Sequence, residues 1–369
     1  MQRAPDLSLL LLSGGSLVGQ NIVQALGARR RHVRLLATNS LADEPSLQAF
    51  DEVLLVPATR TDELALHQAL QPWLSARSPL LVIPCRDDDT VFLAGLQNSA
   101  HLGKGCTLLV GAPEPAQAMR DKWLSWELAQ RHDLPFAPTL VPLEADRIDA
   151  FVARWGFPLL VKPRSGFASQ GVRVLLDQRQ LAAWAGRDDV VVQRYLGPAQ
   201  GPEAYVDDLS RQGIPLFHSF ETVKQSIQVL IAPDGSVQGT CCTLHRMRNG
   251  MSMLVEPDPD PDAPTLGLRC AQVFARLGWR GPLNVQCQRP PGGPLTIYEF
   301  NGRFTGATAA RTLMGFDEVG MALQAFAHRD IGPVATPPAT RVVRQLVSQA
   351  PCPELTSALQ HQGVWCGAP

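Results

Sequence analysis

Three side chains that suit a metal ion and a phosphate occur at every second position near residue 300. The segment 297–303 reads Ile-Tyr-Glu-Phe-Asn-Gly-Arg, and its functional groups are those of Glu299, Asn301 and Arg303. In an extended strand alternate side chains share a face, so Ile297 is expected to project with these three. Carboxylate and amide oxygens suit Mg²⁺, and a guanidinium can neutralise a phosphoryl group. A solvated polar strand face is the simpler interpretation of this segment alone.

A lysine precedes a small-residue segment in the middle of the chain. Lys162 ends an apolar run, and the segment 163–171 that follows is rich in Gly, Ser and Ala. The apolar residues 172–176 then predict a returning strand. The tip of such a hairpin can lay backbone N–H groups and an ammonium over phosphates. The alternative interpretation is an ordinary hairpin with a surface lysine.

Two further charged clusters are candidates for substrate contacts. Asp87 belongs to an Arg-Asp-Asp-Asp run that follows a predicted strand and opens a predicted helix. Helix capping explains such carboxylates, but ligands of open α/β sheets also bind where strands end. Arg246 and Arg248 carry planar guanidinium groups that can bind a substrate carboxylate through two hydrogen bonds. The alternative interpretation is that both belong to a solvated basic loop.

The elements expected to position these groups fall into two halves. Alternating apolar strands and helical stretches over residues 1–112 predict a parallel sheet covered on both faces. The glycines of the turn 14–19 do not fit GxGxxG, so a tight strand-to-helix turn is favoured there over a dinucleotide site. Helices are expected at about 114–132 and 145–155. The later part predicts a mostly antiparallel sheet, whose strands include 203–209, 215–221 and 295–300.

Composition limits the class of protein. The chain has 369 residues, of which 45% are hydrophobic and 18% charged, with a formal net charge of −1. It therefore has enough apolar residues for two or three globular domains, and no global field attracts nucleic acid or an anionic membrane. The eight cysteines show no CxxC spacing and are expected to be reduced thiols. We expect a cytoplasmic protein without a membrane span.

Five separated segments together resemble one protein family. They are Phe157-Pro-Leu-Leu-Val-Lys-Pro-Arg-Ser-Gly-Phe-Ala-Ser-Gln-Gly-Val172, then residues 191–197, 201–207, 281–286 and 299–303. In order and spacing they resemble the ATP-grasp superfamily, and most of all its carbamoyl-phosphate-synthase-like branch. The resemblance covers about residues 113–330.

The resemblance implies a fold of mixed α/β and α+β class. A pre-ATP-grasp parallel α/β domain is expected over 1–112, followed by a two-part ATP-grasp fold. Its small lid with a phosphate flap would span 113–192, and its larger, mostly antiparallel domain with the metal site would span 193–331. A Pro-rich tail, 332–369, is expected to pack on the large domain.

The resemblance also implies roles for individual residues. Lys122 and Lys162 would contact ATP phosphates, and Arg303 would stabilise the acyl-phosphate, so Arg303 and Lys162 are the expected catalytic residues. Glu203 would hold the ribose hydroxyls. The remaining implied contacts are the flap residues Gly166, Ser169 and Gly171, the adenine hinge Gln193, Arg194, Tyr195 and Leu196, and the metal ligands Gln286, Glu299 and Asn301.

Two positions depart from the family pattern. Arg194 stands where many members have glutamate, and Ala168 replaces a frequent flap glycine. Backbone groups can still read the adenine edge, but the nucleotide preference is less firmly implied. Gln286 is neutral where an acidic ligand is also common, which would weaken a second metal ion.

The activity implied is ATP-dependent ligation of a small-molecule carboxylate to an amine through an acyl-phosphate. The cofactors would be ATP and one or two Mg²⁺ ions, with Mn²⁺ as a substitute, and a homodimer is a common arrangement in the family. Two alternatives remain open. One is a partial synthetase that phosphorylates a carboxylate or bicarbonate without forming an amide, and the other is a nucleotide-binding protein without turnover.

Overall fold

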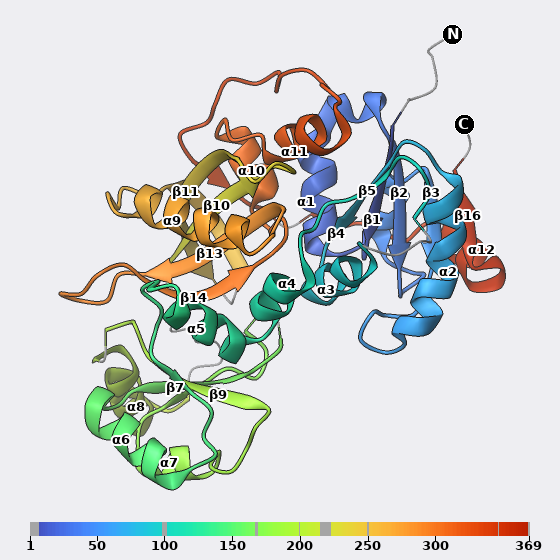
Figure 1. The fold of residues 1–369 in the computed structure, drawn as a ribbon. Helices are drawn as coiled ribbons and strands as arrows, with labels where there is room; N and C mark the ends of the chain where they lie inside the picture. Colours follow the sequence, from blue (N-terminus) through green and yellow to red (C-terminus); the bar gives the residue numbers. More distant parts are fainter. Residues whose placement is uncertain are drawn as a thin grey trace.

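The computed structural model describes residues 7–97, 102–166, 169–198, 200–214, 223–248, 251–345 and 347–367. These residues form three β-sheets with helices packed against them (Figure 1). We refer to them as the N-terminal sheet (β1–β5 with β16), the small sheet (β6–β9) and the central sheet (β10–β15).

The N-terminal sheet is parallel except for its last strand in sequence, and its order is β16-β3-β2-β1-β4-β5. Leu10 of β1 is fully buried between Leu36 and Val82 of the two neighbouring strands, as expected of a sheet covered on both faces. The strands are β1 (Ser8–Leu12), β2 (Arg34–Asn39), β3 (Glu52–Leu55), β4 (Leu80–Pro84), β5 (Cys106–Leu108) and β16 (Val364–Cys366). The helices are α1 (Leu17–Leu26), α2 (Glu63–Ala76), α3 (Asp87–Leu96) and α12 (Pro353–Gln362), with 3-10 turns at Gly27–His32 and Pro45–Ala49.

The small sheet has the order β6-β9-β7-β8, and all its pairings are antiparallel. Leu159 and Val161 of β7 are fully buried and form its core with residues of the adjacent helices. Lys162 therefore lies near the end of a strand that is anchored in this core. The elements are β6 (Thr139–Leu140), β7 (Leu159–Pro163), β8 (Arg173–Leu175), β9 (Val190–Arg194), α6 (Ala145–Trp155), α7 (Gln178–Ala182) and α8 (Gln200–Gln212).

The central sheet is antiparallel, with the order β14-β13-β10-β11-β12-β15. It is the antiparallel sheet that the second half of the sequence predicted. Its strands are β10 (Val223–Ile231), β11 (Val237–Arg248), β12 (Met251–Pro257), β13 (Gly281–Gln288), β14 (Thr296–Asn301) and β15 (Val342–Val343). Its helices are α9 (Ala263–Arg276), α10 (Thr308–Leu313) and α11 (Glu318–Ala327).

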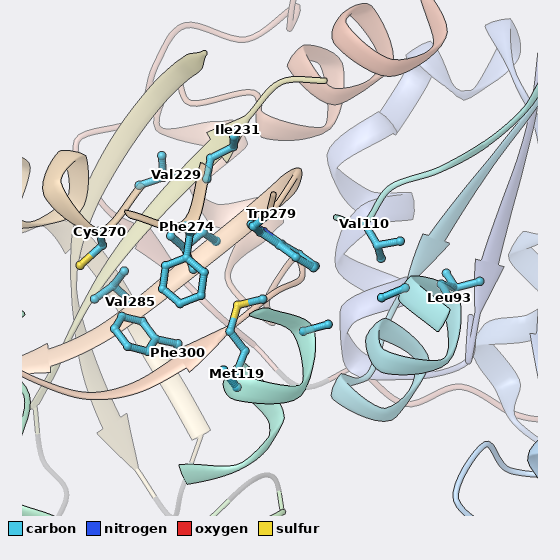
Figure 2. Close-up of a cluster of buried hydrophobic side chains, with 14 of the residues drawn as sticks. Leu93, Val110, Met119, Val229, Ile231, Cys270, Phe274, Trp279, Val285 and Phe300 are labelled. Atoms are coloured by element: carbon cyan, nitrogen blue, oxygen red, sulfur yellow. The ribbon is translucent and has the colours of Figure 1, made fainter. Parts of the chain in front are cut away.

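One apolar core joins the N-terminal sheet to the central sheet. Figure 2 shows Met119 below the Trp279 ring, with Phe300 on one side and Leu93 and Val110 on the other. Trp279 and Phe300 are fully buried. Burial of each such side chain contributes roughly 1.5–3 kcal/mol, so this core holds β14 and the residues that follow it in a fixed position.

A polar residue interrupts the helical region predicted over 114–132. The structure has two helices there, α4 (Pro113–Arg120) and α5 (Lys122–Arg131), because Asp121 leaves the helical conformation and caps α5. Its carboxylate accepts hydrogen bonds from two backbone N–H groups of α5 and pairs with Arg164 at 2.7 Å. As a result Lys122 is the first residue of a new helix and is held near the start of the 163–171 segment.

One predicted strand is a helix. Residues 203–209 were expected to be extended, but they lie within α8 (Gln200–Gln212). Pro202 falls in the first helical turn, where a proline is tolerated, and Glu203 places an acid at the positive end of the helix dipole. The strand predicted at 215–221 lies outside the described residues.

The C-terminal tail contacts two sheets instead of the large domain alone. β15 pairs with β12 at the edge of the central sheet, whereas β16 pairs with β3 and completes the N-terminal sheet. The expectation that the whole tail packs on the large domain is wrong for residues 353–366. All eight cysteines are free thiols. Within the described ranges, no helix has the length and apolar character needed to cross a membrane.

Candidate active site

A cavity of about 720 Å³ lies where the small sheet meets the central sheet. We call it the first cavity. It collects most of the residues to which the sequence assigned nucleotide or metal contacts. The predicted residues that line it are Lys122, Lys162, Gly166, Ser169, Gln193, Arg194, Tyr195, Leu196, Gln286, Glu299, Asn301 and Arg303.

A β-bulge aims Glu299 into this cavity. Gln286 of β13 pairs with Glu299, but the next residue, Cys287, pairs with Ile297, so Tyr298 is an extra residue in β14. Tyr298 and Glu299 both line the cavity, while Ile297 is fully buried in the core. The prediction that Ile297 shares a face with Glu299 is therefore wrong, because the bulge shifts the alternation by one residue.

Lys162 is held at the cavity wall by a chain of buried side chains. Its Nζ donates to Gln193 Oε1 at 2.6 Å, and Gln193 Nε2 donates to Thr139 Oγ1 at 3.0 Å. The ammonium also lies 5.1 Å from the centre of the Tyr298 ring. Such a chain fixes the ammonium in one orientation. The Gln193 side chain therefore positions the Lys162 ammonium.

Lys122 lies close to the carboxylate of the metal-ligand candidate. Its Nζ is 4.0 Å from Glu299 Oε1 and 3.5 Å from the carbonyl oxygen of Gly166. Only 7% of its surface is exposed. The helix start at Asp121 thus brings a cation to the same wall as β14.

Arg303 lies in a cluster of polar side chains at the cavity wall. Its Nη2 donates to Asp87 Oδ2 at 2.9 Å and to Asn301 Oδ1 at 3.2 Å. Burial alone lowers the pKa of the guanidinium, but the carboxylates of Asp87 and Glu299 outweigh it and raise that pKa above its ordinary value. Arg303 is therefore a permanent, oriented cation.

Asp87 and its two neighbours on α3 bind different partners. Asp87 pairs with Arg303, and Asp88 pairs with Arg60 and Arg120. Only Asp89 acts as the capping residue that the sequence predicted, because its Oδ2 accepts from the Arg86 backbone N–H at 3.0 Å. Asp87 thus reaches the site as the partner of Arg303.

The metal-ligand candidates fit an oxygen-seeking cation. Gln286 and Glu299 face each other across β13 and β14, and Gln286 Oε1 is buried without a hydrogen-bond partner in the described part of the chain. An orphaned carbonyl oxygen beside a carboxylate suits Mg²⁺, which binds oxygen. Asn301 Oδ1 is shared with Arg303. Among the described residues no three His, Cys, Asp or Glu side chains cluster for a metal, so this set offers one carboxylate and two amides.

The predicted flap is described only in part. Gly166 and Ser169 line the cavity, whereas residues 167 and 168, which include Ala168, lie outside the described residues. Gly171 is not among the lining residues. Its φ is +74°, and a Cβ there would approach Pro163 Cγ to 2.9 Å. Gly171 therefore serves the turn of the hairpin.

The hinge residues follow β9 along the cavity. The guanidinium of Arg194 packs over the ring of Trp155 at 4.9 Å, and its backbone N–H donates to Pro138 at 2.9 Å. Tyr195 and Leu196 continue the cavity wall. The Arg194 guanidinium thus makes a cation–π contact with Trp155 of α6.

Besides Gly171, three predicted residues are not brought to a cavity. Glu203 is exposed on α8 and lines neither cavity, so the structure does not support its predicted ribose contact. Arg246 and Arg248 are exposed on β11, and Arg246 pairs with Glu256 at 3.0 Å. The alternation of β11 sends His245 and Met247 toward the cavities and these two arginines away.

A second cavity of about 560 Å³ continues from the first. The two share Lys224, Gln286 and Arg303 among their lining residues, so Arg303 lies at their common boundary. The charged residues of the second cavity are six cations, Arg60, Arg86, Arg120, Lys224, Arg303 and Arg344, and two carboxylates, Asp87 and Asp88. This excess of positive charge favours an anionic group.

Sequence reasoning missed several lining residues. Tyr298 lies inside the 297–303 segment, and only the bulge turns it inward. Lys224 is not part of any motif identified in the sequence. Arg344 lies in the Pro-rich tail, to which no function was assigned. His245 is only 6% exposed, and it also lines the second cavity. No local pattern signals these positions.

The chain is similar to known proteins at low sequence identity. No protein-family model matches it. It is 25% identical over 182 residues to the formate-dependent phosphoribosylglycinamide formyltransferase of Burkholderia mallei, a match that covers 49% of this chain and 42% of that protein. The matches span less than half the length of the first curated relatives found.

Solved structures match over most of the chain. N5-carboxyaminoimidazole synthetase from Staphylococcus aureus, solved with ADP, superposes with a TM-score of 0.64 at 13% identity, covering 93% of this chain and 81% of that chain. The biotin carboxylase domain dimer of Hydrogenobacter thermophilus 2-oxoglutarate carboxylase, solved with MgADP and bicarbonate, gives 0.61 at 14% identity, covering 87% and 70%. Together with the three sheets described above, these matches confirm that the chain has the ATP-grasp fold that its motifs predicted.

Proposed function

We propose that this protein is an ATP-dependent carboxylate–amine ligase that forms an amide through an acyl-phosphate and releases ADP and phosphate. The observation that carries this proposal is the place of Arg303 at the boundary of the two cavities. On one side lie the lysines and oxygen ligands suited to a nucleotide and a metal ion. On the other lies a positively charged cavity suited to an acid.

The first cavity would hold MgATP. Lys162 and Lys122 would neutralise phosphate oxygens, and their burial makes each charge more effective than it is in water. Glu299, Gln286 and Asn301 would hold Mg²⁺, with the remaining positions taken by phosphate oxygens and water. When bound, the ion supplies charge neutralisation between the β and γ phosphates. The nucleotide-bound relatives support this assignment.

Arg303 would act on the phosphoryl group in transit. A carboxylate oxygen of the substrate forms a bond to the γ-phosphorus while the bond from that phosphorus to the β–γ bridging oxygen breaks, and ADP leaves. Arg303 is held by Asp87, so its Nη atoms need little reorganisation to stabilise the developing charge. The amine nitrogen then bonds to the acyl carbon, the carbon–oxygen bond to phosphate breaks, and the amine gives up a proton.

A second candidate is phosphorylation of bicarbonate or a carboxylate without amide formation. The observation that favours it is the similarity to a biotin carboxylase domain solved with bicarbonate. Both reactions need the same arrangement around Arg303. They differ in the product, because the ligase yields a stable amide and the partial synthetase yields only a transferable acyl-phosphate.

The test is an ADP-release screen of the purified protein with MgATP, pooled amino acids, bicarbonate and pooled amines, followed by mass analysis of the products. Hydroxylamine in parallel reactions converts an acyl-phosphate into a stable hydroxamate. We expect substrate-dependent ADP release with an amide product in the wild type, and neither in Glu299→Ala. ADP release with bicarbonate alone would favour the second candidate. ADP release that no carboxylate stimulates and that Glu299→Ala leaves unchanged would refute both.

A further inference from the structure

A chain of hydrogen bonds leads from the central sheet into the second cavity. Thr243 Oγ1 lies 3.1 Å from the carbonyl oxygen of Ser226 and 2.9 Å from His245 Nε2. His245 Nδ1 in turn lies 3.0 Å from Ser252 Oγ. Ser252 and His245 line the second cavity and not the first. Thr243 is fully buried, so the chain begins in the protein interior and ends at the cavity wall.

The donors and acceptors of this chain can be assigned from its inner end. A backbone carbonyl only accepts, so Thr243 must donate its single hydroxyl hydrogen to Ser226. Thr243 therefore accepts from His245, which places the ring hydrogen on Nε2. Nδ1 is then an acceptor, and Ser252 must donate its hydrogen to it. The consequence is that Ser252 Oγ presents only lone pairs to the second cavity.

The state of the imidazole agrees with this assignment. Burial, with smaller contributions from Arg311, Lys224 and Arg344, lowers the pKa of His245 to about 3. The ring is therefore neutral near pH 7 and carries one hydrogen. A doubly protonated ring would instead donate to Ser252 and reverse the polarity of its hydroxyl.

A second acceptor lies in the wall of the same cavity. Asn284 Nδ2 donates to Ser226 Oγ at 2.8 Å, to Gln228 Oε1 at 3.0 Å and to the carbonyl of Ile227 at 3.5 Å. The Ile227 carbonyl can only accept, so this contact favours the amide orientation described here. Asn284 Oδ1 is left buried and without a hydrogen-bond partner among the described residues. An unmet buried acceptor is costly, and a ligand that donates a hydrogen bond would satisfy it.

We propose that the second cavity holds the amine substrate, with an N–H group donated to Ser252 Oγ and the Asn284 oxygen as the neighbouring acceptor. This inference rests on the proposed ligase function. It adds the place and the protonation state of the nucleophile. Lys224, Arg303 and Arg344 line the same cavity, and their charges disfavour an ammonium ion. The amine is thus bound neutral, with its lone pair available to attack the acyl-phosphate beside Arg303.

The experiment uses hydroxylamine as the nitrogen nucleophile. The full-length protein with MgATP and the pooled carboxylates is titrated with hydroxylamine, and hydroxamate formation is measured. In Ser252→Ala we expect the half-saturating hydroxylamine concentration to rise about tenfold, the size expected for loss of one hydrogen bond. The KM for ATP should stay unchanged. Ser252→Thr keeps a hydroxyl and should restore the wild-type value. Ser210→Ala, a change at an exposed serine of α8 that lines neither cavity, is the matched control.

The outcomes separate this inference from the proposed function. If the wild type forms hydroxamate but Ser252→Ala shows the same dependence on hydroxylamine, the ligase function stands and the amine site is refuted. The same holds if the change appears in the KM for the carboxylate instead. If the wild type forms no hydroxamate with any carboxylate, the proposed function fails and this inference fails with it. Ser252 is half-buried, so its alanine variant is expected to fold, and circular dichroism melting checks this.

Discussion

The two cavities share a wall but are built from the chain in different ways. The first cavity is lined mainly by two regions of the chain, residues 160–198 of the small sheet and residues 286–303 of β13, β14 and the segment that follows. The second cavity is lined by short runs and single residues from many parts of the described chain, including residues 16–18, residues 85–88, His245 of β11 and Arg344 of the tail.

This difference parallels the two functions that we propose for the cavities. The proposed MgATP site is lined largely by segments that the sequence motifs already marked. The proposed site for the acid and the amine is assembled mostly from residues that belong to none of those motifs. Arg303 belongs to both cavities and is the residue through which they would cooperate.

The largest effect is expected at this shared residue. Arg303→Ala should lower the rate of carboxylate-dependent ADP formation by about 1,000-fold or more, because it removes the charge that stabilises the phosphoryl group and leaves Asp87 unpaired. Arg303→Lys keeps a positive charge but lacks the planar guanidinium group, so it should retain part of the wild-type rate. A loss smaller than tenfold in Arg303→Ala would show that the boundary of the two cavities is not where the chemistry occurs.

A smaller effect is expected for a residue of the first cavity alone. Glu299→Gln should lower activity about 100-fold and raise the Mg²⁺ concentration needed for half-maximal rate, since it removes the one carboxylate of the ligand set. Magnesium titrations of ADP formation measure both quantities. Glu256→Gln, on the outer face of the central sheet, is the matched control. An unchanged Mg²⁺ requirement in Glu299→Gln would place the metal elsewhere.

A residue of the second cavity should alter stability in acid. The pKa of His245 is about 3 in the folded protein and about 6.5 when unfolded, so the unfolded state binds more protons below pH 6.5 and stability falls as the pH drops toward 3. Between pH 7 and pH 5 this group costs about 2 kcal/mol of unfolding free energy. Urea unfolding at pH 7 and pH 5 gives the loss of unfolding free energy between the two pH values. We expect this loss to be about 2 kcal/mol smaller in His245→Asn than in the wild type.

The control for this pH experiment is His361→Asn, a change on the exposed side of α12. It should follow the wild type between pH 7 and pH 5. Equal losses in His245→Asn and the wild type would mean that the imidazole is solvated, and the donor assignment at Ser252 would lose its support.

The smallest effect is expected for a residue that lines neither cavity. Arg246→Ala should leave ADP and hydroxamate formation within twofold of the wild type, because its guanidinium pairs with Glu256 on the sheet surface. Steady-state kinetics with the pooled carboxylates measure this. A large rise in the KM for a carboxylate would support the substrate contact that the sequence predicted for Arg246. It would contradict the assignment of the substrate to the second cavity.

The sequence by itself predicted the fold class and most of the candidate residues that line the first cavity. Apolar runs placed β1 and β4, and the periodicity of 145–155 predicted α6 with its observed bounds. These features are local, since the alternation or helical period of a segment depends on its own residues. The segments around Lys162 and Glu299 were recognisable for the same reason.

Only the tertiary structure decided how these segments are aimed. The bulge at Tyr298 depends on the pairing of β14 with β13, and the Asp121 carboxylate that caps α5 also pairs with Arg164, 43 residues further along the chain. The second cavity needs residues far apart in sequence, such as Asp87 and Arg344, to meet. Contacts of this kind arise when packed elements exclude all other arrangements, and no short pattern in the sequence records them.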